Sequence, residues 1–122
     1  YEKDREFELA PFGMTGIETS LGLMLTHLVG EGVISLNRLV ELMAVNPRAI
    51  LRDERVAIEP GSIADLTVFD PDAEWAVAKD DFCSKAQNTP FVGWNLRGRA
   101  TDVFVGGYAT MEDGVVCSTV KK

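Results

Sequence analysis

Residues 10–29, APFGMTGIETSLGLMLTHLV, contain a turn followed by a helix with very few charged side chains. Pro11 and Gly13 are typical turn residues. Thr15 and Glu18 have the spacing of a capping box, in which the two side chains satisfy backbone N–H groups at the start of a helix. Apolar residues then recur at helical spacing, at Ile17, Leu21, Met24, Leu25 and Leu28.

The other side of this predicted helix is small or weakly polar, at Thr19, Gly22, Thr26 and Val29. A surface helix normally carries charged residues on that side, so we expect the helix to pack on both sides. Gly30 is expected to end it in the left-handed conformation. His27, the single histidine, lies at the edge of the apolar stripe and is expected to have a structural role with a local hydrogen bond.

A second helix is expected to begin at Ser35, a favourable N-cap, and to continue through Leu36, Leu39, Val40 and Met43. Asn46 followed by Pro47 predicts the cap and first residue of a separate short helix.

The pattern changes to strands after residue 55. Short strands are predicted at residues 55–58, 65–70 and 74–77, with a Pro-Gly turn at 59–62 and one helical turn at 80–84. From residue 103, a Gly-Gly turn and an Asp-Gly turn separate three further strands. The order of elements indicates an α+β fold, and strands this short are expected to need partners from elsewhere in a longer chain.

The composition excludes several classes of protein. The 122 residues are 46% hydrophobic, carry a formal net charge of −7, and contain no apolar run long enough to span a membrane. An acidic chain does not favour nucleic acid or an anionic membrane as a partner. Cys83 and Cys117 are expected to be free thiols of a cytoplasmic protein, and one histidine with two isolated cysteines does not make a metal site.

Four segments together resemble a known family. ELAPFGMTGIETSLGLML (residues 8–25) and LMAVNPRAIL (42–51) look like the last helical part of an amidohydrolase barrel. IEPGSIADLTVFD (58–70) is similar to the segment that enters the small β domain of that superfamily. SKAQNTPFVGWNLRGRATDVFVGG (84–107) resembles the closing segment of dihydroorotases, and the chain is identified on these segments as the C-terminal part of a class I dihydroorotase.

The resemblance implies a fold and a chemistry. Residues 1–52 would form the end of a (β/α)8 TIM barrel, and residues 53–122 part of a small β-sandwich domain. The family hydrolyses dihydroorotate, reversibly, to N-carbamoyl-L-aspartate in pyrimidine biosynthesis, using a zinc centre and an aspartate that transfers the proton. Its metal ligands and catalytic aspartate belong to segments before this one. We therefore assign no catalytic and no metal-binding residue here and expect the isolated segment to be inactive.

Phe12 and Gly13 are the residues to which the resemblance gives a substrate-binding role, with Pro11 fixing the entry of the loop and Ala10 lining it. Gly13 allows a ligand to approach its amide, and the following helix start favours an anion. The other interpretation of these residues is a plain turn that positions the helix. The alternating acids Glu2, Asp4, Glu6 and Glu8 are expected to be loop charges.

Asn88, Thr89, Pro90, Phe91 and Trp94 are expected to pack the β domain against the barrel rather than to form a pocket.

Partners follow from the same resemblance. They are the rest of the same chain, dihydroorotate or N-carbamoyl-aspartate, further copies in a homo-oligomer, and aspartate carbamoyltransferase. In an alternative hypothesis the protein is a non-catalytic dihydroorotase-like partner that holds aspartate carbamoyltransferase in a complex. A third possibility is an independent α+β binding module. The apolar helix and the unpartnered strands argue against that module.

Overall fold

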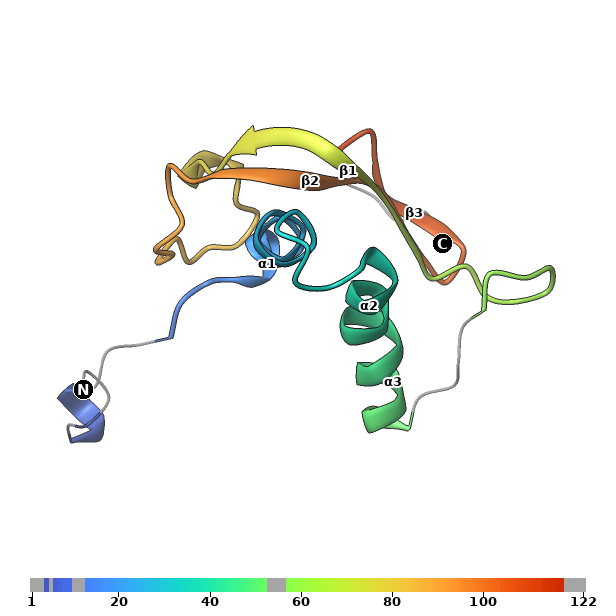
Figure 1. Ribbon diagram of the computed structural model, residues 1–122, viewed down its shortest axis with the longest axis horizontal. Helices are drawn as coiled ribbons and strands as arrows, with labels where there is room; N and C mark the ends of the chain where they lie inside the picture. Colours follow the sequence, from blue (N-terminus) through green and yellow to red (C-terminus); the bar gives the residue numbers. More distant parts are fainter. Residues whose placement is uncertain (1–3, 5, 10–12, 53–56, 118–122) are drawn as a thin grey trace.

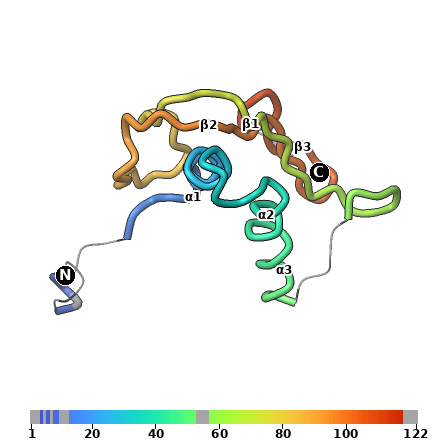
Figure 2. Tube along the Cα trace, viewed as in Figure 1, coloured from blue at the N-terminus to red at the C-terminus, as the bar shows by residue number. Residues whose placement is uncertain are grey.

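The computed structural model describes residue 4 and residues 6–9, 13–52 and 57–117. Helices come first in the chain and an antiparallel sheet follows, as the α+β prediction requires (Figures 1 and 2). The helical elements are η1 (Phe7–Leu9), α1 (Ile17–Met24), η2 (Leu25–Val29), α2 (Leu36–Val40), η3 (Glu41–Val45), α3 (Asn46–Leu51) and η4 (Lys79–Asp81). The sheet has the order β1 (Leu66–Ala76), β2 (Asn95–Val105), β3 (Tyr108–Glu112), β4 (Val115–Val116).

Helix α1 lies against the sheet (Figure 1). Its buried residues are small ones rather than large ones. Thr19 and Gly22 are buried, and a Cβ on Gly22 would lie 3.0 Å from the Trp75 ring and 3.2 Å from a methyl of Leu96. The absence of a side chain at Gly22 therefore lets the helix approach β1 and β2 closely. Of the predicted apolar stripe only Leu25 is buried, and Ile17 is 91% exposed.

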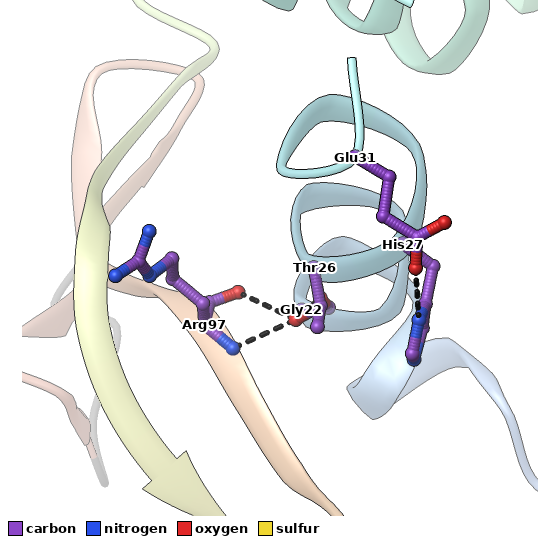
Figure 3. A network of polar contacts seen from close by, with 5 residues as sticks. All are labelled: Gly22, Thr26, His27, Glu31 and Arg97. Carbon is purple, nitrogen blue, oxygen red and sulfur yellow. Dashed lines mark hydrogen bonds and ion pairs between the residues drawn. The ribbon is translucent and has the colours of Figure 1, made fainter. Parts of the chain in front are cut away.

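One threonine joins this helical segment to the sheet (Figure 3). The Thr26 hydroxyl donates to the carbonyl of Gly22 at 2.7 Å and accepts the backbone N–H of Arg97, in β2, at 2.8 Å. A hydroxyl can do both at once, because it has one donor and two acceptor lone pairs. The weakly polar side of the helix therefore contributes a polar contact with the sheet, beside the apolar contact of Leu25.

Two details predicted for the ends of this helix are wrong. The capping box does not form: Gly16 occupies the N-cap, and the Glu18 carboxylate accepts the amides of Cys83 and Ser84 instead. Gly30 has a right-handed φ of −63°, and the left-handed residue is Gly32, at φ +73°. The helix continues as the π-helical turn η2 and ends with Gly30 at its C-cap, which is the predicted position, so only the predicted left-handed conformation of Gly30 is wrong.

The second helical segment begins as predicted and continues past its predicted break. Ser35 caps α2, accepting the N–H of Arg38 at 3.2 Å. Asn46 is helical, at φ −65° and ψ −43°, so it caps no separate helix. The π-helical turn η3 precedes Pro47, and the wider turn accommodates a ring that would clash with a carbonyl of a regular α-helix.

In the described part of the chain, two strands are longer than predicted. The strands predicted at residues 65–70 and 74–77 are one strand, β1, with irregular pairing between Asp70 and Glu74. Ala57 and Ile58 are not in a strand, and the remainder of the strand predicted at 55–58 lies outside the described residues. β2 begins at Asn95, eight residues before the strand predicted at 103.

The turns predicted at 59–62, at Gly106 and Gly107, and at Asp113 and Gly114 are confirmed, with positive φ at Gly61 and at the four hairpin-turn residues. Pro11 and Phe12, in the turn predicted before the first helix, lie outside the described residues.

The described part of the chain buries little apolar surface. Its buried hydrophobic side chains are Leu25, Leu39, Val77 and Leu96, whereas many large ones are exposed, including Ile50 at 80% and Leu51 at 77%. Isolated exposed apolar residues are ordinary, but a set of this size marks surfaces that normally contact other protein. Arg48, in α3, forms an ion pair with Asp65 at 3.7 Å, just before β1.

Candidate functional site

Gly13 lies in an exposed segment without regular secondary structure, four residues before α1. The turn predicted here falls on residues 11–13, of which only Gly13 is described, and we keep the name Gly13 turn for this segment. A Cβ built on Gly13 would meet no atom within 4 Å, so the space beside its backbone is open among the described residues. Open space fits both a ligand contact and a plain turn. Phe12, Pro11 and Ala10 lie outside the described residues.

The loop between β1 and β2 holds this turn from the other half of the chain (Figure 2). The Asn88 side-chain amide donates a hydrogen bond to the Gly13 carbonyl. The backbone carbonyl of Asn88 accepts a hydrogen bond from the backbone N–H of Thr15 at 3.2 Å. One residue therefore holds two consecutive peptide groups of the turn region, across a sequence separation of 75 residues.

Glu18 supplies a second connection between the same two segments. Its carboxylate accepts the amide of Cys83 at 2.8 Å and that of Ser84 at 3.1 Å. Hydrogen bonding from the Ser84 side chain, together with these amides, holds the pKa of Glu18 below its ordinary value, although desolvation opposes the shift. The first turn of α1 and the β1–β2 loop are thus joined by charge-assisted hydrogen bonds.

The Thr15 hydroxyl, expected to cap the helix, is buried and has no hydrogen-bond partner among the described residues. The reason is that α1 begins one residue later than the capping box requires, with Gly16 at the N-cap.

His27 has the structural setting that we expected. Its Nδ1 lies 3.3 Å from Glu31 Oε1 one helical turn later (Figure 3). Its ring meets Trp94 edge-on, with the centroids 5.9 Å apart, and Trp94 meets Phe91 in the same manner at 5.2 Å. Trp94 and Phe91 thus pack the end of the β1–β2 loop against the η2 segment of the first helix.

The described residues do not build a metal centre. No three His, Cys, Asp or Glu side chains in the described ranges lie close enough together to hold a metal ion. Asp4, Glu6 and Glu8 are exposed, and Cys83 and Cys117 are both free, as predicted for the cysteines. No helix in the described part of the chain has the length and apolar character needed to cross a bilayer.

A shallow, open depression of about 280 Å³ lies beside the turn at Glu59–Ser62 and is lined by residues between Ala57 and Leu66. None of its lining residues belongs to the Gly13 turn or to the β1–β2 loop.

Comparison with known proteins gives a consistent result. No family model matches the chain. A dihydroorotase from Geobacter metallireducens is 51% identical over 106 residues, which cover 87% of this chain and 25% of the relative. The chain is related to the C-terminal part of dihydroorotases. It spans about a quarter of the length of the curated relatives it matches.

Solved structures with the same fold belong to the amidohydrolase superfamily. The L-hydantoinase from Arthrobacter aurescens, an amidohydrolase-superfamily member, matches 90% of the chain and 25% of its own length, with a TM-score of 0.79 and 35% identity. The inactive dihydroorotase-like domain of a CAD-like multifunctional protein from Chaetomium thermophilum covers 88% of this chain and 28% of its own, with a TM-score of 0.67 and 23% identity. At that identity the second likeness shows the fold alone.

Sequence patterns identified the Gly13 turn but missed the groups that hold it. Asn88 was expected only to pack one domain on another, and Glu18 only to cap its own helix. Both side chains instead reach across the chain, to partners 65 to 75 residues away. No local pattern could reveal these contacts, because they depend on where the β1–β2 loop lies in space.

Proposed function

We propose that this segment belongs to a zinc-dependent dihydroorotase, which hydrolyses the cyclic amide of dihydroorotate, reversibly, to N-carbamoyl-L-aspartate in pyrimidine biosynthesis. The observation that carries the proposal is 51% identity to a dihydroorotase across 87% of the chain. The exposed Gly13 turn, open to a ligand and followed directly by a helix start, supports it.

Phe12 and Gly13 are the proposed substrate-binding residues. Dihydroorotate carries a carboxylate, and backbone N–H groups ahead of a helix favour an anion. Gly13 leaves room for a substrate atom to come close to the backbone. The described residues offer no metal ligand set, so we assign them binding and no step of the zinc chemistry. The zinc, held by other parts of the enzyme, would supply a hydroxide for attack on the ring carbonyl.

The arrangement proposed for the whole protein is a TIM barrel that ends within residues 1–52 and a β-sandwich domain that includes residues 53–122. The exposed apolar stripe of α1 supports this arrangement, because Ile17 and Met24 face away from the sheet and need a partner. The rest of the same polypeptide is the proposed partner. A cytoplasmic homo-oligomer completes the proposal. The segment prepared alone is expected to show no hydrolase activity, no zinc binding and no cooperative unfolding transition.

The substrate-binding role is tested by Gly13→Val in the whole protein, with dihydroorotate affinity measured by calorimetry. The added side chain would occupy the space that the substrate approaches, so binding should weaken about tenfold or more, or by roughly 1.4 kcal/mol. Ala86→Val, on the exposed β1–β2 loop, adds comparable bulk and should leave the affinity unchanged. Unchanged affinity in Gly13→Val removes the substrate-binding role.

A second candidate function is a non-catalytic dihydroorotase-like partner of aspartate carbamoyltransferase. The inactive dihydroorotase-like domain from Chaetomium thermophilum has the same fold, which is the reason to test this candidate, but the fold is also that of the L-hydantoinase and does not itself favour a non-catalytic role. Zinc content and turnover of the whole protein distinguish the two. A zinc-free, inactive whole protein that binds aspartate carbamoyltransferase would replace the first proposal with the second.

A further inference from the structure

The Gly13 carbonyl accepts a hydrogen bond from the side chain of Asn88, 75 residues along the chain, and this contact suggests a role beyond packing. We infer that Asn88 is a positioning residue for substrate binding: its side-chain amide holds the Gly13 carbonyl and so sets the direction of the next peptide N–H, that of Met14. The inference rests on the proposed function, since it concerns the same substrate-binding turn.

The geometry follows from the peptide group itself. The described chain contains no cis peptide bond, and in a planar trans peptide the C=O and N–H point in opposite directions. The Gly13 carbonyl points to the Asn88 amide, so the Met14 N–H points away from Asn88. Among the described residues, no group accepts the Met14 N–H. The Met14 N–H is therefore a hydrogen-bond donor with a fixed direction, and the carboxylate of dihydroorotate could accept its hydrogen bond.

Further hydrogen bonds fix Asn88 and the direction of the Met14 N–H. The Asn88 carbonyl accepts the Thr15 N–H at 3.2 Å, so Met14 is the residue between two points that Asn88 fixes. The β1–β2 loop that carries Asn88 is held in turn by Glu18, which accepts the amides of Cys83 and Ser84. Donors that are fixed before a ligand arrives bind it with a smaller loss of conformational entropy.

A purely structural role for the same hydrogen bond predicts that its loss lowers the thermal midpoint and kcat together with the affinity. A positioning role predicts a different result. Asn88 and Gly13 are both exposed, so losing one neutral bond between them should change the stability of the fold little. Removing a contact that only orients a ground-state donor should raise KM and leave kcat unchanged. The two roles therefore separate in kinetics and in thermal unfolding.

The test uses Asn88→Asp in the whole protein, with Kd for dihydroorotate from calorimetry and KM and kcat from turnover. Aspartate keeps the shape of asparagine but has no N–H to donate, and the backbone bond to Thr15 remains. We expect Kd and KM to rise about three- to tenfold, the factor for one lost hydrogen bond, with kcat and the thermal midpoint unchanged. Asn88→Gln, which retains an amide donor, should recover part of the affinity. Asn37→Asp, at an exposed site on α2, is the matched control and should change neither Kd nor KM.

The outcomes separate this inference from the proposed function. If Gly13→Val weakens binding and Asn88→Asp does not, the positioning role is overturned and the substrate-binding turn stands. If Asn88→Asp lowers the thermal midpoint and kcat as well as the affinity, the residue is structural and the inference fails. If neither variant changes the affinity, the substrate-binding turn and the positioning role are both overturned. If the unsubstituted whole protein binds no dihydroorotate, the proposed function is overturned as well.

Discussion

Gly98 is the position at which a single methyl group should most disturb the packing of the first helical segment on the sheet. It lies in β2 with a φ of +88°, a conformation that side-chain-bearing residues rarely adopt. A Cβ there would lie 2.2 Å from Leu25 Cδ1 and 3.1 Å from Leu25 Cβ. Leu25 is only 3% exposed, so it has little room to move away.

Gly98→Ala therefore has two separate costs. Holding alanine in the left-handed region costs about 1–2 kcal/mol. Forcing an extra carbon into a filled site costs about 1–3 kcal/mol more through displaced side chains and backbone. The Gly98 carbonyl also accepts the Trp75 indole N–H at 3.0 Å, so a shift of β2 would strain that bond as well. We expect the free energy of unfolding to fall by about 2–5 kcal/mol in total.

The measurement is urea unfolding of the whole protein, with Gly93→Ala as the matched control. Gly93 has a similar φ of +82°, but a Cβ there would meet nothing within 4 Å, so alanine should carry only the backbone cost. The difference between the two variants isolates the clash with Leu25. Combining Gly98→Ala with Leu25→Ala should recover about 1–3 kcal/mol relative to the sum of the single effects. If Gly98→Ala costs no more than Gly93→Ala, the close packing of Leu25 on Gly98 is wrong.

Two further predictions concern polar contacts of the helices. The folded-state pKa of Glu18 is lowered, so the stability from its hydrogen bonds is fully present above its unfolded pKa of about 4.5 and is lost as the pH falls through the lower folded value. Urea midpoints measured between about pH 3 and 7 should fall in acid less steeply for Glu18→Gln than for the parent, and parallel curves for the two proteins would contradict the role of Glu18. Ser35→Ala removes the hydroxyl that accepts the Arg38 N–H at 3.2 Å and should cost about 0.5–2 kcal/mol, whereas Ser35→Asp, which retains a capping oxygen, should restore most of it. An equal loss in both Ser35 variants would contradict the capping role.

Local chemistry was enough to predict several features correctly. The Ser35 cap, the Pro-Gly turn at 59–62 and the two hairpin turns depend on a few neighbouring residues, and all are present in the structure. The apolar spacing of residues 17–28 correctly predicted a helix. The resemblance to dihydroorotases, which depends on four segments along the chain, is confirmed by relatives at up to 51% identity.

Features that depend on a second segment could not be predicted in the same way. The helix was expected to pack on both sides, and its small face at Thr19 and Gly22 does meet the sheet, at the close approach to Trp75 and Leu96 that small residues allow. The sequence could not show that Ile17, on the apolar stripe, has no cover among the described residues. The capping box failed because the Glu18 carboxylate binds two amides of the β1–β2 loop instead of its own helix.

Periodicity, turns and caps act over a few residues, so the amino-acid order alone determined where this chain turns, where Ser35 begins a helix and which family it resembles. Tertiary structure alone decided which face of α1 is covered, that Asn88 reaches Gly13, and that Leu25 leaves no room at Gly98. The physical reason is that these contacts join residues some 70 positions apart, and their energies depend on distances that exist only after the sheet and the first helix have packed together.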